Sequence, residues 1–167
     1  MKIQIRKGLF ETNSSSVHSI VIGNNGEDIH KGLPTTLEFY GGEFGWEHEI
    51  YDDPSSKASY LYTSIINCQS EIDVEDTLKR IKEILEKWGI KAVFEELDKN
   101  NNFMGFSYVD HAYDNIELIK KLISDEDLLM NYLFSTGSSV ETGNDNDETE
   151  FIAGTPKNVL YEYEKGN

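Results

Sequence analysis

The sequence contains a single cysteine, three prolines and no long hydrophobic run. One cysteine cannot form an internal disulfide, and the residues around it, Ile65-Ile66-Asn67-Cys68, are typical of a buried helix face. No apolar stretch approaches the roughly 18 residues that a membrane-spanning helix requires. Residues 1–6 alternate polar and apolar side chains and lack the continuous apolar core of a signal peptide. We therefore expect a protein that stays in the cytosol of the cell that makes it and does not bind membranes.

Basic residues are also scarce. The 167 residues include 15 lysines and arginines against 31 aspartates and glutamates, which gives a net charge of −16. A surface of that charge repels nucleic acid and anionic membranes at long range, and it attracts a basic partner, such as the nucleic-acid channel of a protein that handles DNA or RNA. The alternative is that the acidity only keeps the protein soluble. In either case we expect no binding to free nucleic acid.

The length suits a single domain spanning residues 1–167, which needs no metal or disulfide to fold. Period-two alternation between turn residues predicts strands, and 3–4 spacing of apolar residues predicts helices. Two hairpins are predicted, 2–6 with 17–22 and 90–97 with 103–109. The fold class is therefore α+β, a single compact domain of antiparallel hairpins packed with about four helices. The expected strands are residues 2–6, 17–22, 35–40, 90–97, 103–109 and 159–163, and the expected helices are 54–68, 74–88, 114–123 and 124–134.

A polar segment lies between the first two predicted strands and concentrates a cation, a carboxylate, an amide, hydroxyls and an imidazole. Hydrolysis of a phosphodiester needs such groups, because a base activates a hydroxyl or water and a cation stabilises the anionic transition state. The alternative is structural, since serine and asparagine runs form turns by bonding their own backbone, and a lone histidine beside them is usually a surface residue. The candidate catalytic residues are Arg6, Glu11, Asn13, Ser14, Ser15, Ser16 and His18.

A second polar segment covers residues 138–147. Its carboxylates are oxygen ligands of the kind that Mg²⁺ or Ca²⁺ prefers, although their spacing is not that of an EF-hand. Asp145 and Asp147 are the candidate metal ligands, with Mg²⁺ as the suggested cofactor, and Glu141 and Asn144 are candidate binding residues. The alternative is a solvated acidic loop. If this segment packs beside the first one, the two form one composite polar site.

A third segment, residues 43–53, is acidic and aromatic and is predicted to be an exposed loop. Its carboxylates would imitate phosphates, and its aromatic side chains would imitate bases or anchor an interface. The alternative is a loop that covers the core with its aromatic side chains inward. The remaining histidines, His30, His48 and His111, are scattered and show no zinc-ligand spacing. The candidate binding residues of this segment are Glu43, Trp46, Glu47, Glu49, Asp52 and Asp53.

Residues 2–19 read KIQIRKGLFETNSSSVHS. They resemble the start of small proteins encoded by bacteriophages and mobile elements of Firmicutes, which carry a Phe-Glu-Thr-Asn-Ser-Ser-Ser-x-His-Ser signature. Residues 142–146 resemble a later Thr-Gly-Asn-Asp-like segment of that family. Some small proteins of this general type are anti-CRISPRs that block type II-A Cas9, and one described mechanism is shortening of the guide RNA. The resemblance implies a phage-derived protein that meets Cas9, or its guide-RNA complex, in the host bacterial cytoplasm.

Three hypotheses remain open. In the first, the protein is a ribonuclease acting on guide RNA: His18 and Glu11 exchange protons, Arg6 stabilises charge, Asn13 and the serines position the phosphate, and Asp145 and Asp147 assist through Mg²⁺. In the second, it is a stoichiometric inhibitor whose acidic faces occupy a site for guide RNA or target DNA. In the third, it is an acidic phage accessory protein with an unrelated host target.

Overall fold

The computed structural model of the chain describes residues 16–26, 28–45, 47–96, 107–109, 115–144 and 158–165. These ranges contain both helices and strands, so the predicted α+β class is confirmed. None of the helices they contain is long and apolar enough to cross a membrane. In chain order the elements are β1 (Ser16–Asn24), β2 (Thr36–Phe39), β3 (Glu43–Phe44), β4 (Glu49–Tyr51), α1 (Pro54–Asn67), α2 (Val74–Lys87), β5 (Lys91–Phe94), β6 (Tyr108–Val109), α3 (Ile116–Ser124), α4 (Glu126–Phe134), β7 (Ser139–Asn144) and β8 (Asn158–Lys165).

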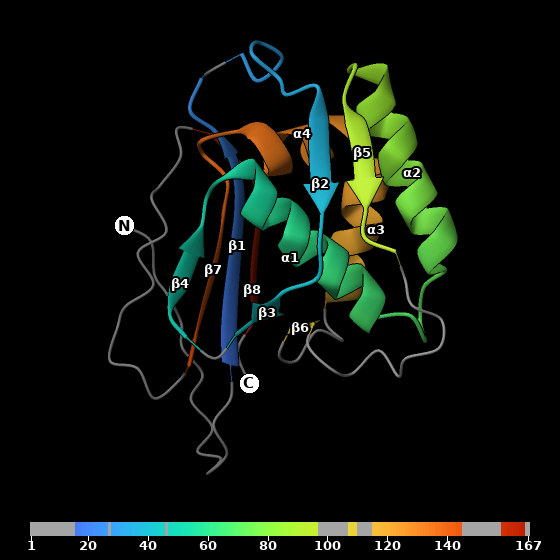
Figure 1. The fold of residues 1–167 in the computed structure, drawn as a ribbon. Coiled ribbons are helices and arrows are strands. Elements are labelled where there is room, and N and C mark those ends of the chain that lie inside the picture. The colour runs from blue at the N-terminus through green and yellow to red at the C-terminus, as the bar shows by residue number, and fades with distance from the viewer. Residues whose placement is uncertain are drawn as a thin grey trace.

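Four strands form the main sheet, in the order β4-β7-β1-β8, with each neighbouring pair antiparallel (Figure 1). β1 lies inside the sheet, because β7 pairs with one of its edges and β8 with the other. The strands predicted at residues 17–22 and 159–163 correspond to β1 and β8. The strand predicted at residues 2–6, and with it the first hairpin, lies outside the described residues.

The described parts of the second predicted hairpin, β5 and β6, do not pair with each other. β5 pairs in parallel with β2, in a register that runs from Thr36↔Lys91 to Phe39↔Phe94, and β6 pairs in parallel with β3. Parallel partners need a long crossover connection, and α1 and α2 supply it because they lie between β2 and β5 in the chain. Alternation of apolar residues located β2 and β5, but the pattern of one strand does not specify which strand it pairs with.

Two polar segments that are expected as loops contain strands. Residues 43–53 include β3 and β4, and residues 139–144 form β7, an inner strand of the main sheet rather than part of a solvated acidic loop. Polar composition misleads here because polar side chains can occupy an inner strand when the fold supplies them with hydrogen-bond partners. Glu141 and Thr142 of β7 are buried and have polar partners of their own, which lowers the cost of burying them.

α1 is the central helix, and it begins at Pro54 as predicted. One side of it contacts the main sheet, where Tyr60 meets His18 of β1. Another side contacts the β2–β5 pair, where Tyr62 stacks on Phe94. Because other elements cover α1 on more than one side, its buried residues occupy all of its faces: Lys57, Ala58, Tyr60, Leu61, Tyr62, Thr63, Ser64, Ile65 and Ile66.

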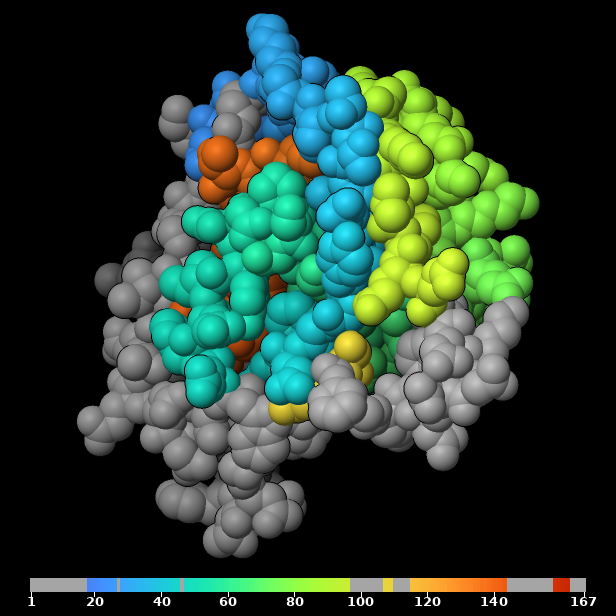
Figure 2. All heavy atoms as spheres, viewed as in Figure 1, coloured from blue at the N-terminus to red at the C-terminus, as the bar shows by residue number. Residues whose placement is uncertain are grey.

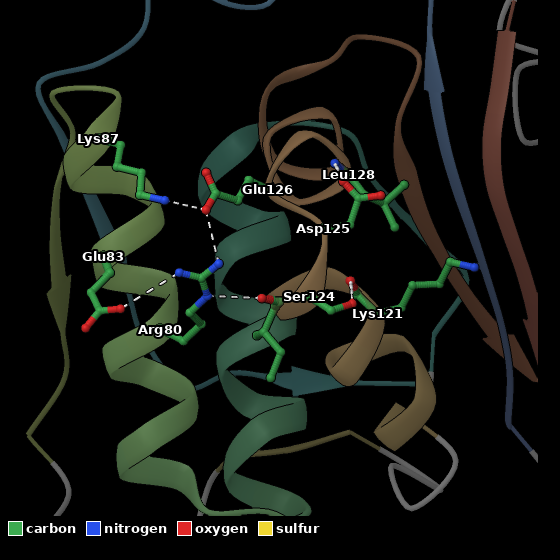
Figure 3. Close-up of polar contacts among 9 residues, drawn as sticks. Arg80, Glu83, Lys87, Lys121, Ser124, Asp125, Glu126 and Leu128 are labelled. Atoms are coloured by element: carbon green, nitrogen blue, oxygen red, sulfur yellow. Dashed lines mark hydrogen bonds and ion pairs between the residues drawn. The ribbon is translucent and has the colours of Figure 1, made fainter.

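The other three helices are joined by charged side chains (Figure 3). Arg80 of α2 donates to Glu126 Oε1 at 3.1 Å, and Lys87 donates to the same carboxylate. The hydrogen bond from Lys87 is the largest of the effects that lower the pKa of Glu126. α4 begins at Glu126 after the N-cap residue Asp125, slightly later than the predicted start at Ser124. α2 is therefore attached to the junction between α3 and α4.

Candidate functional site

The two polar segments of the sequence meet in the main sheet. β1 and β7 pair so that Ser16 lies opposite Asn144, His18 opposite Thr142, and Ser19 opposite Glu141. The two polar segments therefore lie side by side along residues 16–19 and 141–144, although His18 and Glu141 are on opposite sides of the sheet, and a composite functional site stays a prediction. Several predicted members of the site lie outside the described residues: Arg6, Glu11, Asn13, Ser14, Ser15, Asp145 and Asp147.

His18 lies in the protein interior. Its exposed fraction is 1%, and it shares the helix-facing side of β1 with Ile20 and Ile22, both of which are fully buried. Its Nδ1 lies 3.0 Å from the hydroxyl oxygen of Tyr60 on α1. The sequence allowed two alternatives, a catalytic histidine and a surface histidine beside a turn, and the surface alternative is wrong because the side chain is buried against Tyr60 of α1.

A buried polar network surrounds this histidine. Asn115, at the start of α3, donates from Nδ2 to the Tyr60 hydroxyl at 3.2 Å and to Ser64 Oγ at 2.9 Å. His18, Tyr60, Ser64 and Asn115 are each at most 1% exposed. Hydrogen bonds in such an environment are costly to leave unmade, so the network fixes how β1, α1 and α3 pack together.

Replacement of Tyr60 by phenylalanine is expected to lower the free energy of unfolding by about 2 kcal/mol. The change removes a hydroxyl that contacts both His18 Nδ1 and Asn115 Nδ2, and leaves the aromatic packing in place. Urea denaturation followed by circular dichroism measures the loss. The matched control is Tyr40→Phe, because Tyr40 is exposed and its replacement should change stability by less than about 0.5 kcal/mol. Equal losses in the two variants would contradict the importance of the network.

The structure adds a pair of residues on the opposite side of β7. Glu141 is 0% exposed, and its Oε1 lies 2.8 Å from Nε2 of His48, whose side chain is 31% exposed. An ionised carboxylate only accepts hydrogen bonds, so with Glu141 ionised it is Nε2 of the imidazole that donates. In the sequence, His48 is one of several scattered histidines with no motif around it. The two residues are 93 positions apart, and no local pattern links them.

The described residues provide no set of ligands for the predicted metal ion. Within them, no group of three or more histidine, cysteine, aspartate or glutamate side chains is placed to hold a metal ion. The two candidate ligands, Asp145 and Asp147, fall outside those ranges. A role for Mg²⁺ therefore stays a prediction.

The acidic segment before α1 is on the protein surface, on the face shown in Figure 2. Its described acidic residues, Glu43, Glu47, Glu49, Asp52 and Asp53, are all exposed, whereas Trp46 lies outside the described residues. The described aromatic side chains of this segment agree with the alternative prediction, in which the segment covers the core with its aromatic side chains inward. Phe44 is buried and packs edge-on against Tyr51 at 5.2 Å and against Tyr60 at 5.3 Å between ring centroids.

Side-chain contacts hold this segment against β7. Thr142 Oγ1 donates to the carbonyl of Glu47 at 3.0 Å, and His48 is bound to Glu141. The hydroxyl of Tyr51 donates to the Glu49 carboxylate. Burial, together with that carboxylate, raises the pKa of Tyr51 well above its usual value. The exposed carboxylates therefore project from a segment that is anchored at several points.

Asp53 is exposed, and it also has a structural role as the N-cap residue of α1. Its Oδ1 accepts hydrogen bonds from the backbone N–H groups of Ser55 at 2.9 Å and Ser56 at 3.0 Å, which caps α1. Partial burial opposes ionisation of Asp53, but the hydrogen bonds from Ser56 and Ser55 outweigh burial and lower its pKa. The contribution of a group with a lowered pKa is present at neutral pH and is lost as the pH falls through that pKa.

We expect Asp53→Ala to reduce the free energy of unfolding by about 1 kcal/mol at pH 7, because it removes the cap of α1. The difference between variant and wild type should begin to shrink as the pH falls below about 4, the usual pKa of an unfolded aspartate, and should vanish only below the lowered pKa of the folded Asp53 carboxyl. Thermal unfolding at several pH values measures both effects. Asp52→Ala is the control, since Asp52 is also exposed but does not cap α1. A loss that persists unchanged at pH 3 would show that the carboxylate charge is not involved.

Comparison of the chain with known protein families, with curated proteins and with solved structures gives no match.

Proposed function

We propose that this protein is a non-catalytic acidic inhibitor that binds the basic nucleic-acid channel of its target protein. The target that the N-terminal resemblance implies is type II-A Cas9, alone or with its guide RNA, in the host bacterial cytoplasm. The protein would occupy a surface that otherwise binds guide RNA or target DNA. Free nucleic acid would not be a ligand, because the net charge of −16 repels it.

The observation that carries this proposal is the set of exposed carboxylates on the anchored segment of residues 43–53. Glu43, Glu47, Glu49 and Asp52 are exposed on a segment that Thr142 and Glu141 of β7 hold in place. Carboxylates at fixed positions bind a basic surface at a smaller entropic cost than carboxylates on a loose tail. Their spacing is set by β3, β4 and the start of α1.

The test is a nuclease assay with Cas9, labelled guide RNA and a target DNA duplex, with the protein added in increasing amounts. Loss of DNA cleavage at about one protein per Cas9, with the guide RNA intact on a denaturing gel, would support the proposal. Unchanged DNA cleavage at a large excess of protein would overturn it. A second titration at higher salt should weaken inhibition, because salt screens charge-driven association.

Cleavage of the guide RNA is the second candidate. Two observations favour it: the polar segments meet as β1 and β7, and a buried carboxylate contacts a partly exposed imidazole in the pair Glu141–His48. That arrangement orients a histidine for proton transfer. Its distinguishing result in the same assay is shortened guide RNA that disappears in His48→Ala, and in a His18→Ala variant that circular dichroism shows to be folded. Repeating the reaction with EDTA tests the role of Mg²⁺.

A further inference from the structure

We propose that the outer edge of β4 binds an extended, basic segment of the partner protein as an additional strand of the main sheet. This inference rests on the proposed function in one respect, namely that the partner is basic. It specifies how the contact is made: backbone hydrogen bonds along a strand edge give affinity, and flanking carboxylates select lysine and arginine side chains.

The outer edge of β4 has no partner strand in the part of the chain that the structure describes. β4 is the terminal strand of the order β4-β7-β1-β8, and within the described residues it pairs with β7 on one side and with no strand on the other. The N–H and C=O groups of consecutive strand residues point alternately to the two sides. Along the three residues Glu49, Ile50 and Tyr51, at least one residue therefore directs its backbone groups away from β7.

The side chains of β4 indicate the chemistry of the added strand. Ile50 is 48% exposed, on the same side of the sheet as Glu141, which lies opposite it in β7. Glu49 is exposed on the other side of the sheet, and Glu47 and Asp52 lie just before and after β4. Because side chains alternate along a strand, a complementary segment alternates apolar residues, which meet Ile50, with basic residues, which meet Glu49.

The same carboxylates exclude the wrong partner. A second copy of this chain would bring another acidic edge against Glu47, Glu49 and Asp52, and like charges facing each other across a strand pair are destabilising. Charged residues on short edge strands are a common protection against self-association. A basic strand converts this repulsion into attraction, so the edge discriminates between its own copies and the partner.

The edge is also fixed before the partner arrives. The bond from Thr142 to the Glu47 carbonyl and the His48–Glu141 pair hold the chain just before β4, and α1 begins just after it at Pro54. Little ordering of β4 is then needed on binding, which favours affinity.

The experiment uses the full-length protein and a fluorescently labelled peptide of about eight residues that alternates lysine and valine, a length typical of a strand. The comparison peptide has the same sequence with each backbone nitrogen methylated, which keeps the charge and removes the hydrogen-bond donors. Fluorescence anisotropy should show at least tenfold weaker binding of the methylated peptide. Hydrogen exchange should show slower exchange within residues 49–51 when the unmethylated peptide is bound.

Protein variants provide the second comparison. Glu49→Lys should weaken binding of the unmethylated peptide at least tenfold, and Glu71→Lys, at an exposed position beyond the other end of α1, should leave it unchanged. Equal binding of the two peptides, no binding of either, or an undiminished affinity in a folded Glu49→Lys variant would overturn the inference. Cas9 is absent from this experiment. Inhibition of Cas9 without peptide binding would therefore refute the edge contact alone, and peptide binding without inhibition would refute only the proposed target.

Discussion

Replacement of Lys57 by methionine is expected to lower the free energy of unfolding by about 3 kcal/mol. Lys57 is 0% exposed, and its Nζ donates to the backbone carbonyls of Ser135 at 3.2 Å and Ser138 at 3.1 Å. Methionine is an unbranched side chain that replaces the lysine stem as far as Cε, but it lacks the terminal ammonium and donates no hydrogen bond. The variant would therefore leave two carbonyl groups without the ammonium that contacts them in the interior.

The position of these carbonyls adds to the effect. Ser135 is the C-cap residue of α4, and a positive charge near a helix C-terminus interacts favourably with the helix dipole. The same turn is tied to β1, because Ser138 Oγ accepts from the N–H of Gly23 at 3.1 Å and donates to the Asn131 carbonyl at 2.8 Å. Loss of the ammonium would loosen the turn that leads into β7.

One effect works in the opposite direction. Burying an ammonium costs desolvation free energy, and methionine would remove that cost. The net loss is expected because the substitution deletes one partner of an interaction and leaves the other partner in place. Urea denaturation gives the value, and Lys91→Met on β5 is the control, since Lys91 is exposed and its change should stay within about 0.5 kcal/mol. A Lys57→Met variant as stable as wild type would show that desolvation cancels the hydrogen bonds.

Lys57 also illustrates why sequence patterns located α1 but not its role. The spacing of Ala58, Leu61, Ile65 and Cys68 predicts a helix with one buried face, and that face is buried. A lysine outside the apolar stripe is expected in solvent. It is buried because it packs against α4 and the turn that leads into β7, where Tyr132, Ser135 and Ser138 contact it, and this environment depends on elements distant in the sequence. The helix was predictable from local spacing, whereas its coverage on several sides was not.

The candidate site shows the same division between local and distant information. The strand around His18 and the acidic segment of residues 43–53 were both recognisable from composition and alternation. The pairing of β1 with β7 was stated only as a condition, because nothing in either segment specifies the other. The contact between His48 and Glu141 joins residues 93 positions apart, and neither residue carries a motif. Parallel pairing of β2 with β5 escaped prediction for the same reason.

If the protein inhibits Cas9 as proposed, reversal of three acidic residues on the anchored segment is expected to weaken that inhibition at least tenfold. The variant is Glu43→Lys/Glu47→Lys/Asp52→Lys, which leaves Asp53 in place because that residue caps α1. All three positions are exposed, so stability should change little. A few tenths to 1 kcal/mol per charge accounts for the expected factor, since about 1.4 kcal/mol corresponds to a tenfold change in affinity.

A control variant with the same net charge as the first one distinguishes an effect of the acidic segment from an effect of net charge. Glu71→Lys/Glu117→Lys/Glu162→Lys, at exposed positions elsewhere, also raises the net charge by six units, from −16 to −10. If the segment is the binding surface, only the first variant should weaken inhibition strongly, mainly through slower association and a smaller dependence on salt. Equal weakening by both variants would mean that net charge alone attracts Cas9. Full inhibition by the first variant would show that residues 43–52 are not part of the interface. Binding would then depend on acidic residues elsewhere on the surface.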